Sequence, residues 1–303
     1  MNKRQAQLPR LLKDRLQEIT LDKYNSVLHS FSVRRPTTIR ANTLKISGPL
    51  LLRDLRDLGV KLDTVNWCKE AFIVRNKSLK DLRLLKYYQE GYLYVQSLSS
   101  MIPALVLDPK PGEKILDLCA APGSKTTQMA AMMENEGEIV ANEPNPIRAQ
   151  KLNANLLKQG VTNTKMVNLY GEDVYKKYSD YFDRVLVDAP CSGEGRIHTY
   201  DPETFRGWSL GKIERYVKVQ KKLLISAVLA VKKGGIIVYS TCTLEPEENK
   251  GVVDEILQKA GGYLVLEEIK IEGKEGEKGK KGILRVWPDK LMEGFFIAKM
   301  RKR

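Results

Sequence analysis

Short apolar runs alternate with amphipathic helical segments from residue 114 onward, and this rhythm limits the fold more than any other feature. Parallel strands need a crossover connection, usually a helix, so such alternation predicts an α/β fold with a doubly wound, mainly parallel sheet. Two further runs near the end are expected to form an antiparallel hairpin. The expected strands are 114–118, 138–141, 165–168, 184–188, 235–240, 283–286 and 294–298, with helices after Pro122 and over 146–157 and 212–231.

The residues before this sheet differ in character from those within it. Residues 1–45 contain ten Lys/Arg against three Asp/Glu, and apolar residues recur at helical spacing across 8–28. We therefore expect residues 1–34 to be a basic helical segment. Residues 35–95 combine short strands with two helices and predict a small α+β domain, which leaves 96–303 for the main domain. The low-complexity stretch 270–282 is expected to be a mobile loop.

The net charge of +14 says more about partners than about fold. A positive field concentrates polyanions, so nucleic acid is the natural partner, although a lysine-rich solvated surface gives the same total. No apolar run approaches the ~20 residues needed to cross a bilayer, and the first residues lead into a charged segment rather than a signal-peptide core. We expect a cytoplasmic protein without membrane contact, with a monomer as the default.

The four cysteines are Cys68, Cys119, Cys191 and Cys242. They lack the close CxxC spacing of a zinc site, so no metal is expected, and in a reducing compartment they remain thiols. Cys191 and Cys242 each follow an expected strand, in DAPCSG and STCT. The carboxyl ends of parallel strands share one edge, where ligands bind, so these two thiols should face one cleft. A free cysteine is usually a small buried apolar residue, but two in matching polar turns favour chemistry.

The first strand of the sheet runs through DLCAAPGSKT, residues 117–126, directly into a helix. Its small residues let a ligand approach the backbone, and amides at the helix start point toward it. The spacing is not GxGxxG, so dinucleotide binding is a minority interpretation. An acidic residue follows each of the next three strands. Glu143 can accept ribose hydroxyls and Asp173 can hold an adenine amino group, and Asp188 is the third of these acids. Any one of them is equally compatible with helix capping, but three together favour a nucleoside site.

The chain resembles the RsmB/NOP2/Sun family of S-adenosylmethionine-dependent RNA cytosine-5 methyltransferases across residues 36–303. The motifs DLCAAPGSKT, ANE, GED, DAPCSGEG and STCTLEPEEN, in that order, carry the resemblance, and the Pro-Cys and Thr-Cys pair is highly specific. It implies a Rossmann-like class I methyltransferase fold, S-adenosyl-L-methionine as cofactor, Cys242 as nucleophile and Cys191 as an aid to product release. Ser124 replaces a glycine of many relatives, a small departure. The implied cofactor contacts are Cys119, Ala120, Ala121, Pro122, Gly123, Ser124, Lys125, Glu143, Arg148, Asp173 and Asp188.

Carbon-5 of cytosine is a poor nucleophile, so a thiolate must first add at carbon-6. The reaction needs a cysteine of low pKa, an acid near ring nitrogen-3 and a base or release group, which Cys242, Asp188 and Cys191 fit in that order. Lys125 can hold the base carbonyl or keep a thiolate charged. A stacked base cannot react, so the substrate should be a loop or an extruded nucleotide. The loop 194–208 mixes cations with aromatic residues and either clamps RNA or is an ordered surface loop.

Two other functions stay open. A DNA cytosine methyltransferase would use the Pro-Cys thiol as nucleophile, so Cys242 argues against it. A non-catalytic RNA-binding or ribosome-assembly protein is favoured by charge alone, and the thiol pair and cradle argue against it. No additional C-terminal RNA-binding domain is recognisable, so the N-terminal domain and the catalytic face should recognise tRNA or rRNA, with tRNA slightly preferred for compactness. The side chains expected to bind RNA phosphates are Lys3, Arg4, Arg10, Lys13, Arg15, Arg34, Arg35 and Arg40.

Overall fold

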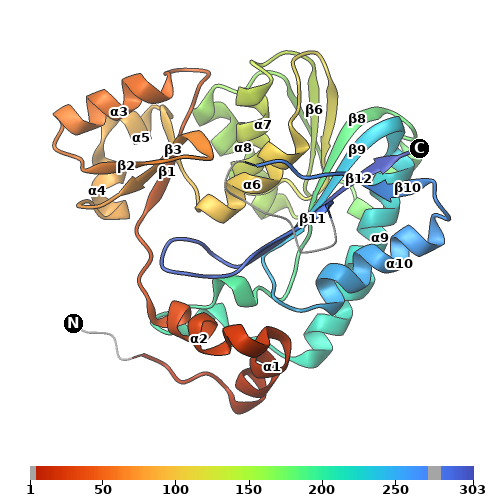
Figure 1. Cartoon of the computed structure of the whole chain (residues 1–303). Coiled ribbons are helices and arrows are strands. Elements are labelled where there is room, and N and C mark those ends of the chain that lie inside the picture. Colours follow the sequence, from red (N-terminus) through yellow and green to blue (C-terminus); the bar gives the residue numbers. More distant parts are fainter. Residues whose placement is uncertain (1–4, 272–280) are drawn as a thin grey trace.

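The computed structural model describes residues 5–271 and 281–303. Lys3, Arg4 and residues 272–280 of the expected loop lie outside these ranges. Figure 1 shows two N-terminal helices first, then a small sheet with its own helices, and then a large sheet flanked by longer helices. An N-terminal domain thus precedes the main sheet, as the predicted fold class requires.

The N-terminal helical segment consists of two helices. α1 (Arg10–Thr20) ends where Leu21 takes a left-handed backbone, φ 47°, and a 3-10 turn leads into α2 (Tyr24–Ser32). The reason is packing, because one straight helix cannot bury both apolar faces in the same cluster. That cluster joins the helices to the later loop at 197–205, and its buried members include Leu12, Leu16, Val27, Phe31, Ile197 and Phe205.

The small sheet is four-stranded and has the order β2-β3-β1-β4, with antiparallel pairing throughout. Its strands are β1 (Thr38–Ala41), β2 (Leu62–Val65), β3 (Cys68–Val74) and β4 (Leu93–Val95), the last of which the sequence did not suggest. α3 (Gly48–Asp57) covers one face through Leu51 and Leu55. α4 (Leu79–Leu84) begins at Ser78 with a capping box, and α5 (Lys86–Gln89) follows it.

The large sheet is doubly wound and mainly parallel, which confirms the predicted fold class. Across the described residues its strand order is β10-β12-β9-β8-β5-β6-β7, with β11 paired to β12. The strands from β5 to β9 are parallel, and β12 pairs antiparallel with β9, β10 and β11. Their bounds are β5 (Lys114–Asp117), β6 (Glu138–Asn142), β7 (Thr164–Val167), β8 (Phe182–Asp188), β9 (Val231–Thr241), β10 (Leu264–Leu266), β11 (Ile283–Val286) and β12 (Phe295–Lys302).

Helices cover both faces of this sheet, because side chains along each strand alternate between two cores. Leu116 and Val185 enter one core, whereas their chain neighbours Ile115 and Leu186 enter the other. The first core packs against α9 (Leu210–Ala230) and α10 (Val252–Lys259), and the second against α6 (Leu98–Leu107) and α7 (Ser124–Met132). α8 (Pro146–Gln159) lies beside α7 and packs on the edge near β6.

The winding of the sheet reverses at β5, which lies between β6 on one side and β8 on the other. Open α/β sheets bind ligands in the crevice at such a switch point, outside the carboxyl ends of the strands. None of the helices within the described ranges is both long and apolar enough to span a membrane. The described side chains also include no group of three or more His, Cys, Asp or Glu arranged to hold a metal ion.

Candidate active site

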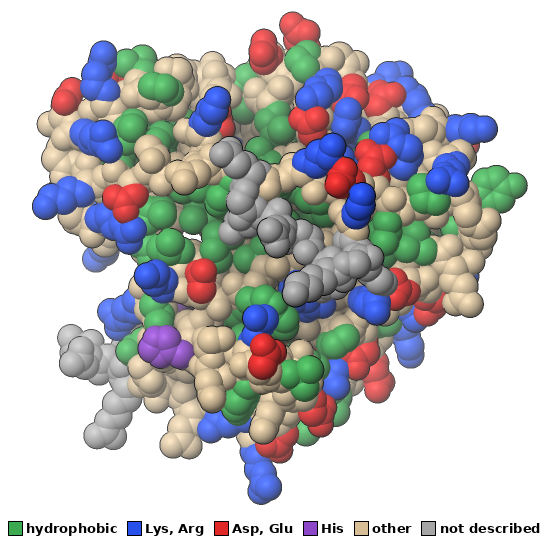
Figure 2. Space-filling model, in the orientation of Figure 1, with side chains coloured by type: hydrophobic (Ala, Val, Ile, Leu, Met, Phe, Trp, Pro, Cys, Tyr) green, Lys and Arg blue, Asp and Glu red, His purple; other side chains and the backbone are tan. Residues whose placement is uncertain are grey.

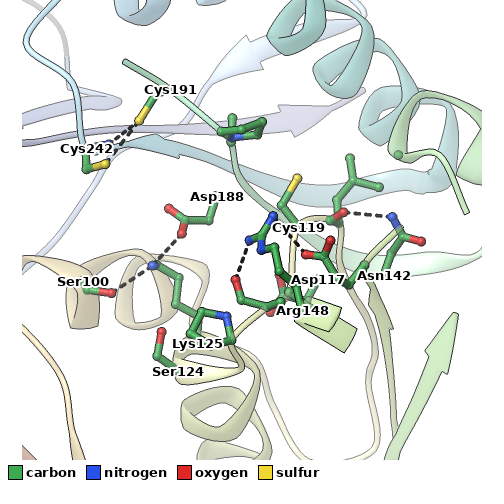
Figure 3. A pocket seen from close by; sticks show the side chains of 18 of the residues that line it. Ser100, Asp117, Cys119, Ser124, Lys125, Asn142, Arg148, Asp188, Cys191 and Cys242 are labelled. Carbon is green, nitrogen blue, oxygen red and sulfur yellow. Dashed lines mark hydrogen bonds and ion pairs between the residues drawn. The ribbon is translucent and has the colours of Figure 1, made fainter. Parts of the chain in front are cut away.

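A cavity of about 680 Å³ opens at the carboxyl ends of β5, β6, β8 and β9. Residues of β4 and α6, and the segment that enters β12, close it from the side of the small sheet. Both Cys191 and Cys242 line this cavity, as do Lys125, Asp188 and Arg148 (Figure 3). The structure therefore brings the predicted catalytic residues and most of the predicted cofactor contacts into one space.

The turn between β5 and α7 forms the floor of the cavity. Cys119, Ala120, Ala121, Pro122, Ser124 and Lys125 all line it. Gly123 does not, but its backbone explains the turn: φ is +103°, and a Cβ atom there would lie 2.9 Å from the side chain of Leu152. Only glycine takes this conformation without strain, so α7 starts where its amides face the cavity.

Glu143 follows β6 with its side chain buried and its carboxylate at the cavity wall. The carboxylate accepts the backbone N–H of Asn145 at 2.9 Å and pairs with Arg148 at 3.2 Å. The cap of α8 is instead the Asn145 side chain, which accepts two N–H groups of the first turn. Arg148 also donates to the carbonyl of Ala121 at 2.9 Å, so it ties the two turns together.

Asp173 lies apart from the other predicted contacts. It belongs to the short helix Gly171–Lys176, and its carboxylate pairs with Lys176 at 2.7 Å. Asp173 does not line the cavity, whereas Gly171 and Glu172 of the same turn do. Asp173 therefore lies next to the two residues of this turn that reach the cavity. Its contact with the cofactor stays a prediction.

Asp188 and Lys125 form an ion pair at the centre of the cavity, with 2.7 Å between Nζ and Oδ2 (Figure 3). The hydroxyl of Ser240, at the end of the neighbouring strand β9, donates to the other Asp188 oxygen at 2.8 Å. Lys125 is buried and also donates to Ser100 at 2.9 Å. Both charged groups are thus held in one orientation, Lys125 from the cradle and Asp188 from β8.

The sulfur atoms of Cys191 and Cys242 are 3.2 Å apart, and the backbone N–H of Cys242 points to the Cys191 sulfur at 3.3 Å. The hydrogen bond from Cys191 lowers the pKa of Cys242, and the Arg196 guanidinium lowers it further. The same contact, together with burial, raises the pKa of Cys191 well above its ordinary value. The two thiols are therefore unequal, and Cys242 is the one that ionises more readily.

The other two cysteines lack this environment. Burial raises the pKa of Cys119 far above its ordinary value, and the nearby carboxylates of Asp117 and Asp188 add to the effect. Burial likewise raises the pKa of Cys68, in the small sheet, to about 11. Both remain neutral thiols near neutral pH, so Cys242 is the cysteine whose surroundings favour a nucleophile.

Several cavity residues escaped the sequence analysis. Asp117 ends β5 fully buried: one oxygen accepts from Thr126 at 2.7 Å, and the other has no hydrogen-bond partner in the described chain. Burial raises the pKa of Asp117 to about 7. The other cavity residues that were not predicted do not follow parallel strands. No local sequence signal marks them, and only tertiary packing brings them to the cavity. They include Tyr94, Gln96, Ser97, Ser100, Tyr216, Glu293 and Phe295.

The expected phosphate-binding set needs correction. Arg40 is fully buried and donates to Gln96, Thr127 and the carbonyl of Ser124, so it is wrong as a phosphate contact. Arg35 donates to the carbonyls of residues 289 and 292, and Arg15 pairs with Glu245 at 2.8 Å. Internal partners occupy these three guanidinium groups, which a charge count cannot reveal. Arg10 and Arg34 are exposed, and Lys13 is partly exposed.

The loop 194–208 packs against the N-terminal helices as well as lining the cavity. Trp208 donates from its ring nitrogen to Glu194 at 2.6 Å, and Arg34 lies over the ring of Tyr200 at 4.7 Å. Arg196 lines the cavity, whereas Arg206 pairs with Glu203. The loop thus holds the N-terminal helices beside the site.

The fold and the cavity define a Rossmann-like methyltransferase. The solved structure of NSun6 from Pyrococcus horikoshii with SFG matches 97% of this chain, and 98% of that one, with a TM-score of 0.86 and 26% identity. Residues 104–301 match the family described as 16S rRNA methyltransferase RsmB/F, and residues 8–98 match the N-terminal domain of 16S rRNA methyltransferase RsmF. The chain therefore belongs to the RsmB/F methyltransferase family.

Two similar proteins differ in how much of their own length this chain covers. The tRNA (cytosine(49)-C(5))-methyltransferase of Pyrococcus abyssi is 42% identical, and the alignment spans 88% of each chain. The ribosomal RNA small subunit methyltransferase F of Aeromonas salmonicida is 40% identical over 89% of this chain, but this chain spans only 59% of that protein.

The cofactor of this family is S-adenosylmethionine, and the cradle fits it. Asp117 keeps a buried oxygen without a partner, and the Glu143 carboxylate lies at the wall, so acceptors are available for amino and hydroxyl groups. Small side chains at Ala120 and Ala121 leave the backbone open to a ligand.

Proposed function

We propose that this protein transfers the methyl group of S-adenosylmethionine to carbon-5 of a cytidine in RNA, through a covalent bond between Cys242 and carbon-6 of the base. The observation that carries the proposal is the contact between Cys191 and Cys242 in the cavity that also contains the cradle. The pKa of Cys242 is lowered, as a nucleophile requires, and the pKa of its partner is raised.

The cofactor is held by the cradle residues from Cys119 to Lys125, by Glu143 and by Arg148. Glu143 accepts the ribose hydroxyls, and the free oxygen of Asp117 is available to an amino group. When bound, S-adenosylmethionine supplies an electrophilic methyl group. The protein contributes orientation, because the Asp188–Lys125 pair is already formed in the structure.

On the base, each catalytic side chain has a defined role. The Cys242 thiolate adds to carbon-6, which makes carbon-5 electron-rich enough to take the methyl group. As the thiolate adds, Asp188 relays a proton from the Lys125 ammonium to ring nitrogen-3, and Lys125 also donates to the base carbonyl; their 2.7 Å ion pair keeps both groups aimed at the same ring. After methylation, solvent water takes the carbon-5 proton, and the electrons of that C–H bond re-form the double bond between carbons 5 and 6. The Cys242 thiolate is expelled, the proton on nitrogen-3 returns to the Asp188–Lys125 pair, and Cys191, in contact with the Cys242 sulfur, assists the release.

The substrate is RNA, and we favour tRNA over rRNA. The Pyrococcus abyssi relative named for a tRNA position aligns along 88% of both chains, whereas the Aeromonas relative named for ribosomal RNA is much longer. Lys and Arg side chains are spread over the face shown in Figure 2, several of them around the notch between the small sheet and the N-terminal helices. The small α+β domain, residues 35–95, adjoins the cavity through Tyr94 and is the proposed recognition unit.

The test is methyl transfer from labelled cofactor to purified tRNA and, separately, to 16S rRNA transcripts. We expect label in 5-methylcytidine after nuclease digestion, with more from tRNA, and bisulfite sequencing then maps the position. Label from rRNA alone would reverse the substrate preference. No label from either RNA, with cofactor binding intact, would favour a non-catalytic RNA-binding protein. The same assay is run on duplex DNA, and label there would favour a DNA cytosine methyltransferase.

A further inference from the structure

A network of hydroxyl and carboxyl groups ties the two cysteine turns together. Ser192 follows the first cysteine and Thr243 the second, and their hydroxyl oxygens are 2.9 Å apart. Ser192 Oγ also contacts Glu194 at 2.8 Å and, still more closely, Glu248. Thr243 contacts the same Glu194 oxygen. The hydroxyl of Ser192 is therefore the one group that touches the other three.

Both carboxyl groups of this network are fixed from behind. Glu194 and Glu248 are fully buried, although buried carboxyl groups are rare in proteins. The ring nitrogen of Trp208 donates to Glu194 at 2.6 Å, and the Gln220 amide donates to Glu248 at 2.7 Å. The backbone N–H of Ser192 donates to Glu248 at 3.1 Å as well. With every partner held by the fold, the network has little freedom to rearrange.

A count of protons shows that this network is held tightest when one carboxyl is protonated. It contains four close oxygen pairs: Ser192–Thr243, Ser192–Glu194, Ser192–Glu248 and Thr243–Glu194. The two hydroxyl groups supply only two protons, so a protonated carboxyl must supply a third. The fourth pair is then satisfied only if the Ser192 proton is shared between Thr243 and Glu194, both of which lie within hydrogen-bond distance of it. Burial raises the pKa of Glu248 to about 7, and the charge of Glu194 adds to the effect. A neutral Glu248 removes the repulsion that two adjacent carboxylates would exert.

We propose that Ser192 is a positioning residue, whose hydroxyl, held by Glu194 and Glu248, keeps the turn of Cys191 against the turn of Cys242 and so fixes the two sulfurs in contact. The backbone adds one more link, from the N–H of Gly195 to the carbonyl of Cys242 at 3.0 Å. The consequence for catalysis rests on the proposed function, but the positions of the sulfurs do not depend on it.

Thiol–disulfide exchange measures this contact without RNA or cofactor. The Cys242 thiolate attacks oxidised glutathione and releases one glutathione, leaving a mixed disulfide. Cys191 then displaces the second glutathione, so the two protein thiols are oxidised to one disulfide and one reagent is reduced to two thiols. The second step depends on how close the sulfurs lie. Cys68 and Cys119, whose pKa values are raised, react slowly and give little background.

We expect the wild-type protein to pass to the internal disulfide without accumulating the mixed form, as followed by intact mass. Ser192→Ala should slow ring closure by about tenfold or more, because small displacements cost large factors in such reactions, and the mixed disulfide should accumulate. Ser192→Thr, which keeps the hydroxyl, should restore closure. The matched control is Ser226→Ala, which removes the hydroxyl of a buried serine on α9 whose contact is a backbone N–H at 3.4 Å.

Thr243→Val, which removes the other hydroxyl at constant shape, is the second variant and should behave like Ser192→Ala. Thermal unfolding of each variant shows that it is folded. If both folded variants close the disulfide at the wild-type rate, the network does not position the thiols and the proposal is wrong. Slowed closure combined with absent methyl transfer in the wild-type protein would overturn the proposed function and leave the positioning role intact.

Discussion

The sulfur atoms of Cys191 and Cys242 lie 3.2 Å apart, although 51 positions separate the two residues in the chain. Their strands are parallel neighbours, with Asp188 of β8 in register with Ser240 of β9. Cys191 is the third residue after the end of β8, and Cys242 directly follows β9. The sheet therefore delivers both thiols to one point. Their hydrogen bond lowers the pKa of Cys242 and raises that of Cys191, so the two thiols differ in the direction that the proposed nucleophile and its proposed partner require.

Cys242→Ala should abolish methyl transfer while cofactor affinity changes by less than about 0.5 kcal/mol, because the proposed contact of this thiol is with the base rather than with the cofactor. Transfer is measured with labelled cofactor and affinity by calorimetry. Cys68→Ala, in the small sheet and with its thiol pKa raised, is the control and should keep full activity. Wild-type turnover in Cys242→Ala would assign the nucleophile elsewhere.

Glu143→Ala should weaken cofactor binding by roughly 1–3 kcal/mol, the usual cost of leaving buried polar groups without partners. Calorimetry with S-adenosylmethionine measures the loss directly. Glu255→Ala removes a carboxylate on α10 that pairs with Lys221 and Lys259, away from the cavity, and should leave affinity unchanged. Equal affinity in both variants would mean that Glu143 only orders its own turn through Asn145 and Arg148.

Much of this site was predictable because parallel strands end at one edge. That rule alone places Glu143, Asp188, Cys191 and Cys242 together, and the structure brings all four to the cavity. For Asp173 the rule leads to the right turn, but Gly171 and Glu172 are the residues of that turn that line the cavity, and a contact between Asp173 and the cofactor stays a prediction.

Features that depend on distant partners left no local signal. The break at Leu21 follows from packing of both N-terminal helices on a loop nearly 200 positions away. Arg40 resembles any exposed cation in a charge count, yet its partners Gln96 and Thr127 bury it. The carboxyl of Glu248 lies in a quoted motif, but only its contact with Ser192 shows what it does.

The protonation of Glu248 predicts a pH-dependent stability. The pKa of this carboxyl is about 7 in the folded protein against an ordinary value of 4.5, so between these values the folded state binds more protons than the unfolded state. Stability should therefore fall as the pH rises from about 4.5 to about 7, by roughly 3 kcal/mol from this group. Glu248→Gln should flatten that fall, as measured by urea unfolding at a series of pH values.

Glu255→Gln is the matched control for this measurement. Lys221 lowers the pKa of the Glu255 carboxyl below its ordinary 4.5, so this group stabilises the fold above that pH and loses its effect only in more acidic solution. The slope between pH 4.5 and 7 should stay as in the wild-type protein. A Glu248→Gln profile parallel to the wild type would show that Glu248 titrates normally in the folded state.

Replacing Arg10 and Arg34 by alanine should reduce the salt dependence of RNA binding. If both exposed guanidinium groups contact phosphates, the slope of log affinity against log salt should flatten by roughly one to two units, with cofactor affinity unchanged. The control removes Lys250 and Lys259, which pair with acids on α10. An unaltered slope in the arginine variant would make the N-terminal helices packing elements and move RNA recognition to the cavity rim around Arg196.

The most direct test of the two-cysteine chemistry is to trap its intermediate. Cys191→Ala should leave the Cys242 adduct without help in release, so incubation with cofactor and substrate RNA should give a protein–RNA band that survives denaturing electrophoresis. The double variant Cys191→Ala/Cys242→Ala should give none, which assigns the bond to Cys242. If Cys191→Ala methylates RNA at the wild-type rate without a trapped band, or if the double variant forms the band, the proposed roles of the two cysteines are contradicted.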